Sequence, residues 1–248
     1  MKLTIIETGR PPDIIAAHFP RYPVMVAELL SAHVPELAVE TVALVEGEAL
    51  PAPEAVEAVL VTGSPHGVYD PVPWIAPLKS FMRRCAAREV PQVGICFGHQ
   101  LMAEAFGGRA AKAPQGWGIG RHSYRVALSD GFMAGHCGRD VHMAVSHQDQ
   151  VLEKPEVAEV LLASDFTPYA ALAYRHAPAI SFQGHPEFAP DFADALIRSR
   201  RGTRFPEALA DAALASLADG ELDGDLVGRW IGGFLRSHAA ARPARQAA

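Results

Sequence analysis

The sequence predicts an α/β fold in which helices cover both faces of a central mixed, mostly parallel β-sheet. In the first half of the chain, short apolar and β-branched runs alternate with segments of helical periodicity, which implies crossover connections between parallel strands. Between residues 109 and 183, short strands follow one another with turn residues between them, which predicts a mixed or antiparallel extension of that sheet. A chain of 248 residues suits one domain of this class.

Each element follows from its local pattern. Alternating or continuous apolar runs predict strands at residues 3–8, 37–44, 58–63, 91–95, 121–128, 141–146, 159–164, 170–175 and 179–184. Apolar residues at three- and four-residue spacing predict helices at residues 24–32, 74–87, 97–106, 190–201, 206–218 and 226–238. We expect residues 1–238 to form the domain and the small, polar residues 239–248 to form a flexible tail.

Composition and charge narrow the function classes. The formal net charge of −6 argues against nonspecific binding to nucleic acid or to anionic membranes. The first apolar stretch is interrupted by Glu7 and Arg10, unlike a signal peptide, and apolar runs stay below the roughly 18 residues of a membrane span. The three widely spaced cysteines, Cys85, Cys96 and Cys137, fit a reducing compartment, so we expect a cytoplasmic protein.

Cys96 lies at a sharp corner of the predicted fold. Gly94, Cys96 and Gly98 form Gly-x-Cys-x-Gly between a predicted strand and a predicted helix, which is the context of a nucleophile elbow. The glycines remove the Cβ atoms that would collide where strand and helix come close. The amides at the start of the helix favour a thiolate, so Cys96 is a candidate nucleophile. The alternative is a buried structural cysteine.

A thiol nucleophile needs a base and a group that orients the base, and the stretch SFQGHPEFAP offers both. Pro186 keeps His185 out of the helical region, and in an extended chain residues i and i+2 point the same way. Glu187 is therefore expected to orient the His185 imidazole. A surface turn that happens to contain His-Pro-Glu is the alternative, but this segment ends a strand and is expected at the same sheet edge as Cys96.

A third segment, VLVTGSPHGVYD, runs from an apolar strand into a loop that can present backbone amides. An amide near Ser64, together with the amide of Phe97, is expected to hold a developing oxyanion. An ordinary turn is the alternative. A phosphate loop is disfavoured because no Gly-Lys-Ser/Thr follows.

With these segments in this order, the chain resembles the class I glutamine amidotransferase, or triad glutaminase, superfamily. The resemblance rests on TGSP, GICFGHQ and GHPEF and extends from the first strand to about His238. GHPEF and SHQDQVLEKP are most similar to the glutaminase domain of GMP synthase and to stand-alone γ-glutamyl peptidases. We therefore expect a flavodoxin-like three-layer fold with the nucleophile elbow after a central strand.

The resemblance implies a role for each matching residue. Cys96 would attack the γ-carbonyl of glutamine or of another γ-glutamyl small molecule and form a thioester, with His185 as base and acid and Glu187 orienting it. Ser64 and Phe97 match the positions whose backbone amides form the oxyanion hole. The positions that match the contacts to the bound glutamine are Gln100, Ser146, His147, Gln148 and Asp149. No metal or organic cofactor is implied. GMP synthases usually have a second glycine in place of Ser64, so the backbone is expected to be less free there.

Four functions stay open at this level. The chain is expected either to supply ammonia to a separate synthase subunit or to act alone as a γ-glutamyl hydrolase. A cysteine peptidase of the same architecture is a third interpretation, which the GHPEF and SHQD segments disfavour. A non-catalytic binding or regulatory protein on this scaffold is the fourth, and the presence of Cys96, His185 and Glu187 argues against it.

Other motifs predict structure instead of chemistry. His136, Cys137, His142 and His147 lie close in sequence, but strand alternation would not gather them into a tetrahedral zinc site. The glycines of QGWGIG lead into a strand, which disfavours a dinucleotide site. His99 is expected to point away from Cys96. The basic run RSRRGTR, residues 198–204, is interpreted as a solvated helix end.

Overall fold

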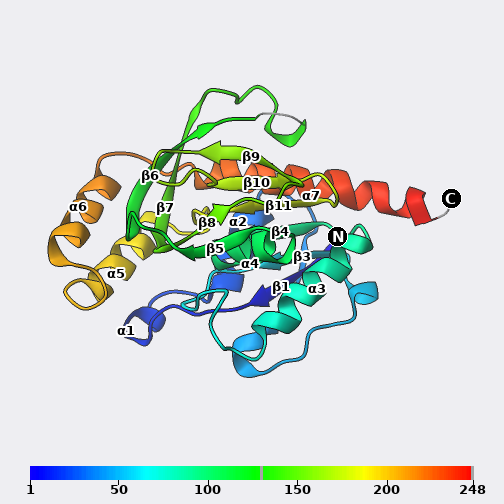
Figure 1. Cartoon of the computed structure of the whole chain (residues 1–248), viewed down its shortest axis with the longest axis horizontal. Coiled ribbons are helices and arrows are strands. Elements are labelled where there is room, and N and C mark those ends of the chain that lie inside the picture. The colour runs from blue at the N-terminus through cyan, green and yellow to red at the C-terminus, as the bar shows by residue number, and fades with distance from the viewer. Residues whose placement is uncertain (129–130, 247–248) are drawn as a thin grey trace.

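The apolar runs of the first half build the parallel half of a nine-stranded sheet in the computed structural model, which describes residues 1–128 and 131–246 (Figure 1). Every residue of β3 and β4 is buried, as expected for parallel strands covered on both faces. The strands of this sheet are β1 (Lys2–Glu7), β2 (Ala38–Ala43), β3 (Ala58–Val61), β4 (Gln92–Ile95), β6 (Gly118–Val126), β7 (Asp140–His147), β9 (Ala158–Ala163), β10 (Ala171–Tyr174) and β11 (Ala179–Phe182).

The order of the strands is β2-β1-β3-β4-β11-β10-β9-β6-β7. Neighbours from β2 to β11 are parallel, and neighbours from β11 to β7 are antiparallel. The parallel part has the doubly wound order that is typical of flavodoxin-like folds. The predicted fold class is therefore confirmed, including the antiparallel extension from the second half of the chain.

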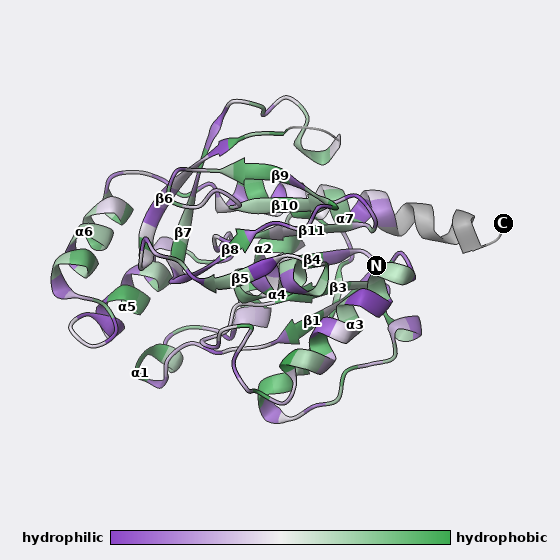
Figure 2. Cartoon of the chain, viewed as in Figure 1, coloured by the Kyte–Doolittle hydropathy of each residue, from purple (hydrophilic) through white to green (hydrophobic). Residues whose placement is uncertain are grey.

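Helices cover both faces of this sheet. They are α1 (Asp13–Ala16), α2 (Tyr22–Ser31), α3 (Ile75–Ala87), α4 (Phe97–Ala105), α5 (Pro190–Arg200), α6 (Glu207–Ala218) and α7 (Gly224–Gln246). One apolar cluster joins α2 and α7 to the sheet, and another joins α3 and α4 to its other face. Helices α5 and α6 pack against β6. Figure 2 shows hydrophobic residues along β1 and β9, inside these layers.

The structure differs from the sequence prediction in four places. A separate two-stranded antiparallel sheet, β5 (Arg109–Lys112) with β8 (Asp149–Glu153), was not predicted, because both strands are short and half exposed. The four-residue helix α1 was also missed. Helix α2 starts earlier than predicted because Pro23 is tolerated in its first turn. Helix α7 continues past His238 to Gln246, and residues 247–248 of the predicted tail lie outside the described residues.

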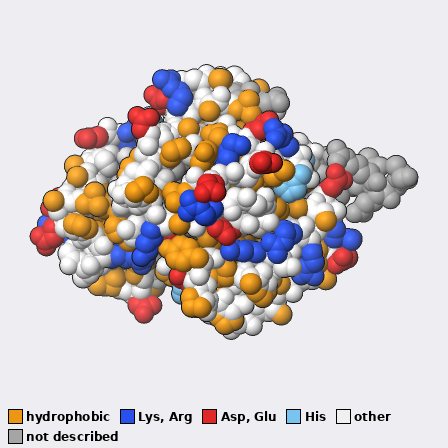
Figure 3. Space-filling view, viewed as in Figure 1, with side chains coloured by type: hydrophobic (Ala, Val, Ile, Leu, Met, Phe, Trp, Pro, Cys, Tyr) orange, Lys and Arg blue, Asp and Glu red, His pale blue; other side chains and the backbone are white. Residues whose placement is uncertain are grey.

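The surface mixes charges of both signs. Figure 3 shows Lys and Arg interspersed with Asp and Glu over the face in view. Among the described residues, no helix is both long and apolar enough to span a membrane.

The elbow depends on glycines at the contact between β3, β4 and α4. A Cβ atom on Gly94 would lie 2.6 Å from the carbonyl oxygen of Gly98, and one on Gly98 would lie 2.3 Å from the carbonyl oxygen of Val61. Both carbonyl oxygens belong to the backbone, so they cannot rotate away from an added Cβ atom as the end of a flexible side chain could. The predicted reason for the glycines is thus confirmed.

We expect Gly98→Ala to lower the free energy of unfolding by about 2 kcal/mol or more, because the added methyl group forces α4 away from β3. Urea unfolding followed by circular dichroism measures this. Glu28→Ala, on the exposed side of α2, is the control and should change stability by no more than about 0.5 kcal/mol. A Gly98→Ala protein as stable as the wild type would contradict the steric argument.

Candidate active site

Cys96 occupies the turn between β4 and α4 in a strained conformation. Its backbone angles are φ 52° and ψ −99°, a region that residues with a side chain rarely adopt. The Cys96 amide donates to the carbonyl of Phe182 in β11 at 2.8 Å, which fixes the turn to the sheet. The side chain stands at the N-terminus of α4 and is 6% exposed.

His185 and Glu187 lie together just after β11. The His185 Nδ1 atom is 2.8 Å from Glu187 Oε1, and both side chains are buried. The His185 amide donates to the carbonyl of Ala144 at 2.9 Å, and the ring of Phe188 stacks on the imidazole at 3.9 Å. The imidazole is therefore held by a carboxylate, a backbone bond and an aromatic face.

The imidazole of His185 also lies beside Cys96, because both side chains line one small cavity. Gly63, at the end of β3, lies against both groups: a Cβ atom there would be 2.9 Å from His185 Cε1 and 3.8 Å from Cys96 Cβ. Segments that follow three adjacent parallel strands, β3, β4 and β11, thus meet at one point.

Burial and charge act in opposite directions on His185. Burial disfavours the charged imidazolium and lowers its pKa, whereas the Glu187 carboxylate and the Cys96 sulfur favour it. The attractions prevail, so the pKa of His185 is raised above its ordinary value. This environment therefore supports a protonated imidazole beside Cys96.

The loop after β3 is held by Thr8, the residue that follows β1. The Thr8 hydroxyl group donates to the carbonyl of Thr62 at 2.9 Å and to that of Gly63 at 3.1 Å. Ser64 is not among the described non-glycine residues with positive φ, so its side chain causes no strain there. Within the described part of the chain, no backbone carbonyl accepts a hydrogen bond from the Ser64 amide.

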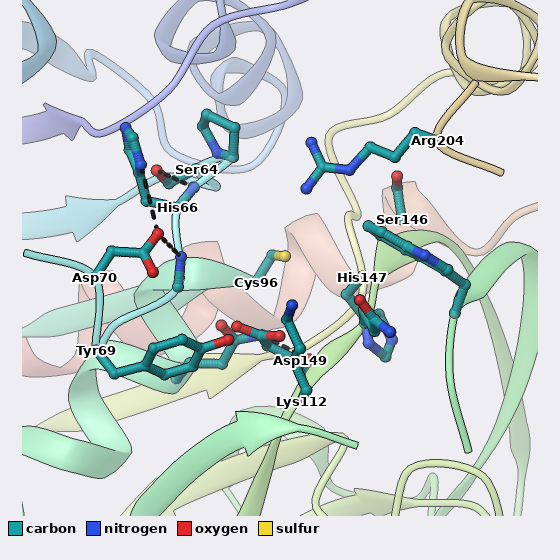
Figure 4. Close-up of a pocket in the computed structure, with 15 residues that line it drawn as sticks. Ser64, His66, Tyr69, Asp70, Cys96, Lys112, Ser146, His147, Asp149 and Arg204 are labelled. Carbon is teal, nitrogen blue, oxygen red and sulfur yellow. Dashed lines mark hydrogen bonds and ion pairs between the residues drawn. The ribbon is translucent and has the colours of Figure 1, made fainter. Parts of the chain in front are cut away.

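Cys96 opens into a pocket of about 380 Å³ (Figure 4). The residues predicted to contact substrate all line it: Gln100, Ser146, His147, Gln148 and Asp149. Gln100 is oriented by the carbonyl of Asp149, to which its Nε2 atom donates at 2.8 Å. Burial lowers the pKa of His147 to about 3, so that this ring is neutral.

Sequence reasoning missed several residues of this site. Gln183, buried beside the elbow, donates from Nε2 toward Cys96 Sγ at 3.6 Å and accepts from Gln100 at 3.2 Å. The residues of the pocket wall that were not predicted include His66, Tyr69, Asp70, Lys112, Trp117 and Arg204. Tyr69 and Asp70 belong to the segment VLVTGSPHGVYD, and Arg204 to the basic run that was interpreted as a solvated helix end, whereas Lys112 comes from a part of the chain without a motif.

Charges in the pocket are arranged unevenly. Figure 4 shows Asp149, Lys112 and Tyr69 on one side of Cys96 and Arg204 on the opposite side. Burial, partly offset by a hydrogen bond from Tyr69 and by Lys112, raises the pKa of Asp149. Burial and the same hydrogen bond raise the pKa of Tyr69 to about 12.

Two histidines of the cluster that was weighed as a zinc site have partners outside the pocket. His142 bonds Asp223 at 3.1 Å, and His136 packs its ring against Trp230 at 5.3 Å. No three His, Cys, Asp or Glu residues gather as a metal site within residues 1–128 and 131–246. His99 is fully buried and pairs with Ser181 at 2.8 Å, away from the pocket.

The comparisons with known proteins agree with one another. The family model described as glutamine amidotransferase class-I matches residues 31–200. A glutamine amidotransferase-like protein of Schizosaccharomyces pombe is 30% identical over 183 residues, which cover 73% of this chain and 72% of the relative. Gamma-glutamyl peptidase 4 of Arabidopsis thaliana is 28% identical over 175 residues, covering 68% and 69%. A glutamine-hydrolyzing GMP synthase subunit of Archaeoglobus fulgidus is 36% identical over 99 residues, covering 40% and 53%.

The fold is shared with solved structures at low sequence identity. The crystal structure of a glutamine amidotransferase from Thermotoga maritima has a TM-score of 0.66 at 19% identity and covers 93% of this chain and 97% of its own. The glutamine amidotransferase structure from Methylobacillus flagellatus has a TM-score of 0.68 at 19% identity, covering 94% of each chain.

We expect Glu187→Gln to lower the pKa of His185 by about one pH unit or more, because the carboxylate's attraction is lost while burial remains. NMR titration of the His185 ring measures this directly. Glu207→Gln, which neutralises an exposed carboxylate on α6, is the control and should leave that titration unchanged. An unaltered His185 pKa in the Glu187→Gln protein would show that another group sets it.

Proposed function

The chain belongs to the class-I glutamine amidotransferase family, and from this premise we propose that it hydrolyses the γ-glutamyl amide bond of glutamine or of a γ-glutamyl compound. The observation that carries the proposal is the meeting of Cys96 with the His185–Glu187 pair at the mouth of the pocket. A nucleophile in contact with a base, and a base held by a carboxylate, are the parts that acyl transfer requires.

In the first half of the proposed reaction, the Cys96 sulfur attacks the γ-carbonyl carbon. The raised pKa of His185 and its contact with Cys96 support an imidazolium–thiolate pair before the attack. The amides of Ser64 and Phe97 stabilise the negative charge that develops on the carbonyl oxygen. Phe97 is in the first turn of α4, where amides lack partners within the helix, and no backbone carbonyl among the described residues accepts a hydrogen bond from the Ser64 amide. His185 donates its proton to the leaving nitrogen, the C–N bond breaks, and a thioester remains.

In the second half, water takes the place of the departed amine. His185, now neutral, accepts a proton from that water as its oxygen attacks the thioester carbon. The C–S bond breaks, glutamate leaves, and the proton on the imidazole restores the starting pair. Glu187 keeps its hydrogen bond to Nδ1 through both halves and so leaves the other ring nitrogen free for transfer.

The pocket supports an amino acid end group on the substrate. A γ-glutamyl group carries both an amine and a carboxylate at its α-carbon, and the pocket offers the carboxylates of Asp70 and Asp149 together with the ammonium of Lys112. Gln100 and Ser146 to Asp149 are proposed to orient this group. The pairing of opposite charges in a confined pocket fixes the γ-carbonyl over Cys96.

Two roles are consistent with this chemistry, and similarity to a known protein supports each of them. Similarity to γ-glutamyl peptidase 4 favours a hydrolase that acts alone on γ-glutamyl compounds. Similarity to the GMP synthase subunit of Archaeoglobus fulgidus favours a glutaminase that passes ammonia to a separate synthase subunit. The leaving group, an amine in one case and ammonia in the other, separates the two.

Cys96→Ala is expected to reduce release of ammonia from glutamine, and of alanine from γ-glutamyl-alanine, by about four orders of magnitude, because no other group forms the thioester. Ammonia and alanine are measured separately in each reaction. Cys137→Ala, which removes the exposed thiol outside the site, should retain wild-type rates.

Turnover that survives in Cys96→Ala would refute the proposed nucleophile. Cleavage of the dipeptide by the isolated protein would support the stand-alone role. Cleavage of glutamine alone would support the ammonia donor, and absence of both activities would favour the non-catalytic interpretation.

A further inference from the structure

The four arginines of residues 198–204 divide into two pairs with different surroundings. Arg198 pairs with Asp194 at 2.6 Å, and Arg201 pairs with Asp211 at 2.7 Å, both exposed to solvent. These two agree with the predicted solvated helix end. Arg200 and Arg204 do not, because they line a second cavity beside Cys96, and for them the prediction is wrong.

Arg200 and Arg204 are held in place by contacts that leave their charge unneutralised. Arg200 donates from Nη1 to Ser146 Oγ at 3.2 Å, and its guanidinium lies 5.9 Å from the Phe205 ring centre. Arg204 lies over the Trp117 ring at 5.0 Å. Within residues 1–128 and 131–246, no ion pair joins either arginine to an acidic side chain. Two cations therefore face the site without a carboxylate in direct ion-pair contact, although Asp149 acts on Arg204 at longer range.

The second cavity is smaller than the first, about 40 Å³ against about 380 Å³, and differs from it in charge and in the side chains that line it. It is lined by His185 as well as Cys96, whereas the substrate pocket is lined by Cys96 without His185. No acidic side chain among the described residues lines it. The third arginine there, Arg10, already pairs with Glu46 and Glu7. Arg204 borders both cavities, so the two adjoin at the mouth of the site.

The position of His185 shows which part of the substrate belongs on this side. The imidazole must reach the leaving nitrogen to protonate it, so the leaving group projects toward the cavity that His185 lines. Asp149 and Lys112, the proposed contacts of the γ-glutamyl end, lie on the other side of Cys96 (Figure 4). Whatever is attached to the leaving nitrogen consequently meets Arg200 and Arg204.

An anion between Arg200 and Arg204 would offset the repulsion between their two positive charges. Burial lowers the pKa of Arg200, and the like charge of Arg204 acts in the same direction, against the opposing influence of Tyr22 and Cys96. Guanidinium groups bind carboxylates with two parallel hydrogen bonds, and such charge-assisted bonds are stronger than neutral ones. Ammonia, the leaving group of glutamine, offers no anion here.

We propose that Arg200 and Arg204 bind the carboxylate of the leaving group, so that the preferred substrates are γ-glutamyl amino acids or peptides with a free carboxylate next to the scissile bond. The proposal rests on the proposed γ-glutamyl hydrolysis and assigns the specificity of that reaction to two further residues. It favours the stand-alone role over ammonia supply.

The test compares two substrates that differ only in charge, γ-glutamyl-alanine and γ-glutamyl-alaninamide. The wild type should cleave the carboxylate form with kcat/KM about 10- to 100-fold higher. Arg204→Gln and Arg200→Gln should each remove most of this preference, measured as the ratio of kcat/KM for the two substrates in the same protein. Arg198→Gln, exposed and on the same segment, should retain the wild-type preference.

Equal cleavage of the two substrates by the wild type would overturn the proposal. An Arg200→Gln protein that loses activity equally on both would show that Arg200 only positions Ser146, and would overturn its role in specificity. Unchanged preference in Arg204→Gln would do the same for Arg204.

Binding to the Cys96→Ala protein tests the arginines without turnover. Calorimetry should show γ-glutamyl-alanine binding about tenfold or more tighter than γ-glutamyl-alaninamide, with the difference lost in Cys96→Ala/Arg204→Gln. Equal affinities would overturn the proposal even if hydrolysis is confirmed. If the wild type cleaves neither substrate but the difference in affinity is present, the proposed hydrolysis fails and the carboxylate site stands.

Discussion

The close approach of α4 to β3 at Gly98 is the constraint on which the site depends. With no Cβ atom at Gly98, the backbone of α4 lies against the carbonyl of Val61, and this contact sets where the helix begins. Cys96 must then complete the turn with a positive φ of 52°. The strain is sustained because β4 and α4 are largely buried. The result is a thiol lifted clear of the sheet, at the helix N-terminus.

Sheet order turns this local feature into a site. β4 lies between β3 and β11, and all three are parallel, so their carboxyl ends reach the same edge. The loop after β3, the elbow after β4 and the His185 segment after β11 therefore converge, although more than a hundred residues separate the first from the last. In antiparallel β7, the carbonyl of Ala144 accepts the backbone hydrogen bond that holds His185 in place. Moving any of these strands by one place would separate Cys96 from His185.

Charge then divides the space around Cys96 into two unequal halves. Asp149 and Lys112 lie on one side and supply opposite charges, which suit the amino acid end group of the proposed substrate. Arg200 and Arg204 lie on the other and supply only positive charge. The same segment that carries them also carries Arg198 and Arg201, which pair with acids in solvent. Neighbours in sequence thus serve different purposes, because the end of α5 and the turn after it direct some side chains inward and others outward.

The sequence by itself determined the fold class, the elbow, and the association of His185 with Glu187, because each depends on local rules: hydrophobic period, the need for glycine at close backbone contacts, and the geometry of an extended His-Pro-Glu. It also indicated which pocket residues to expect from SHQD. Only the tertiary structure decided how Gln183, Lys112, Arg200 and Arg204 contribute. Their partners are distant in the chain, and a basic run has the same appearance in sequence whether its charges face solvent or a cavity. Whether an arginine is buried, and whether a carboxylate pairs with it, is decided only when separate elements pack together. A sequence therefore does not show whether an arginine faces solvent or a cavity.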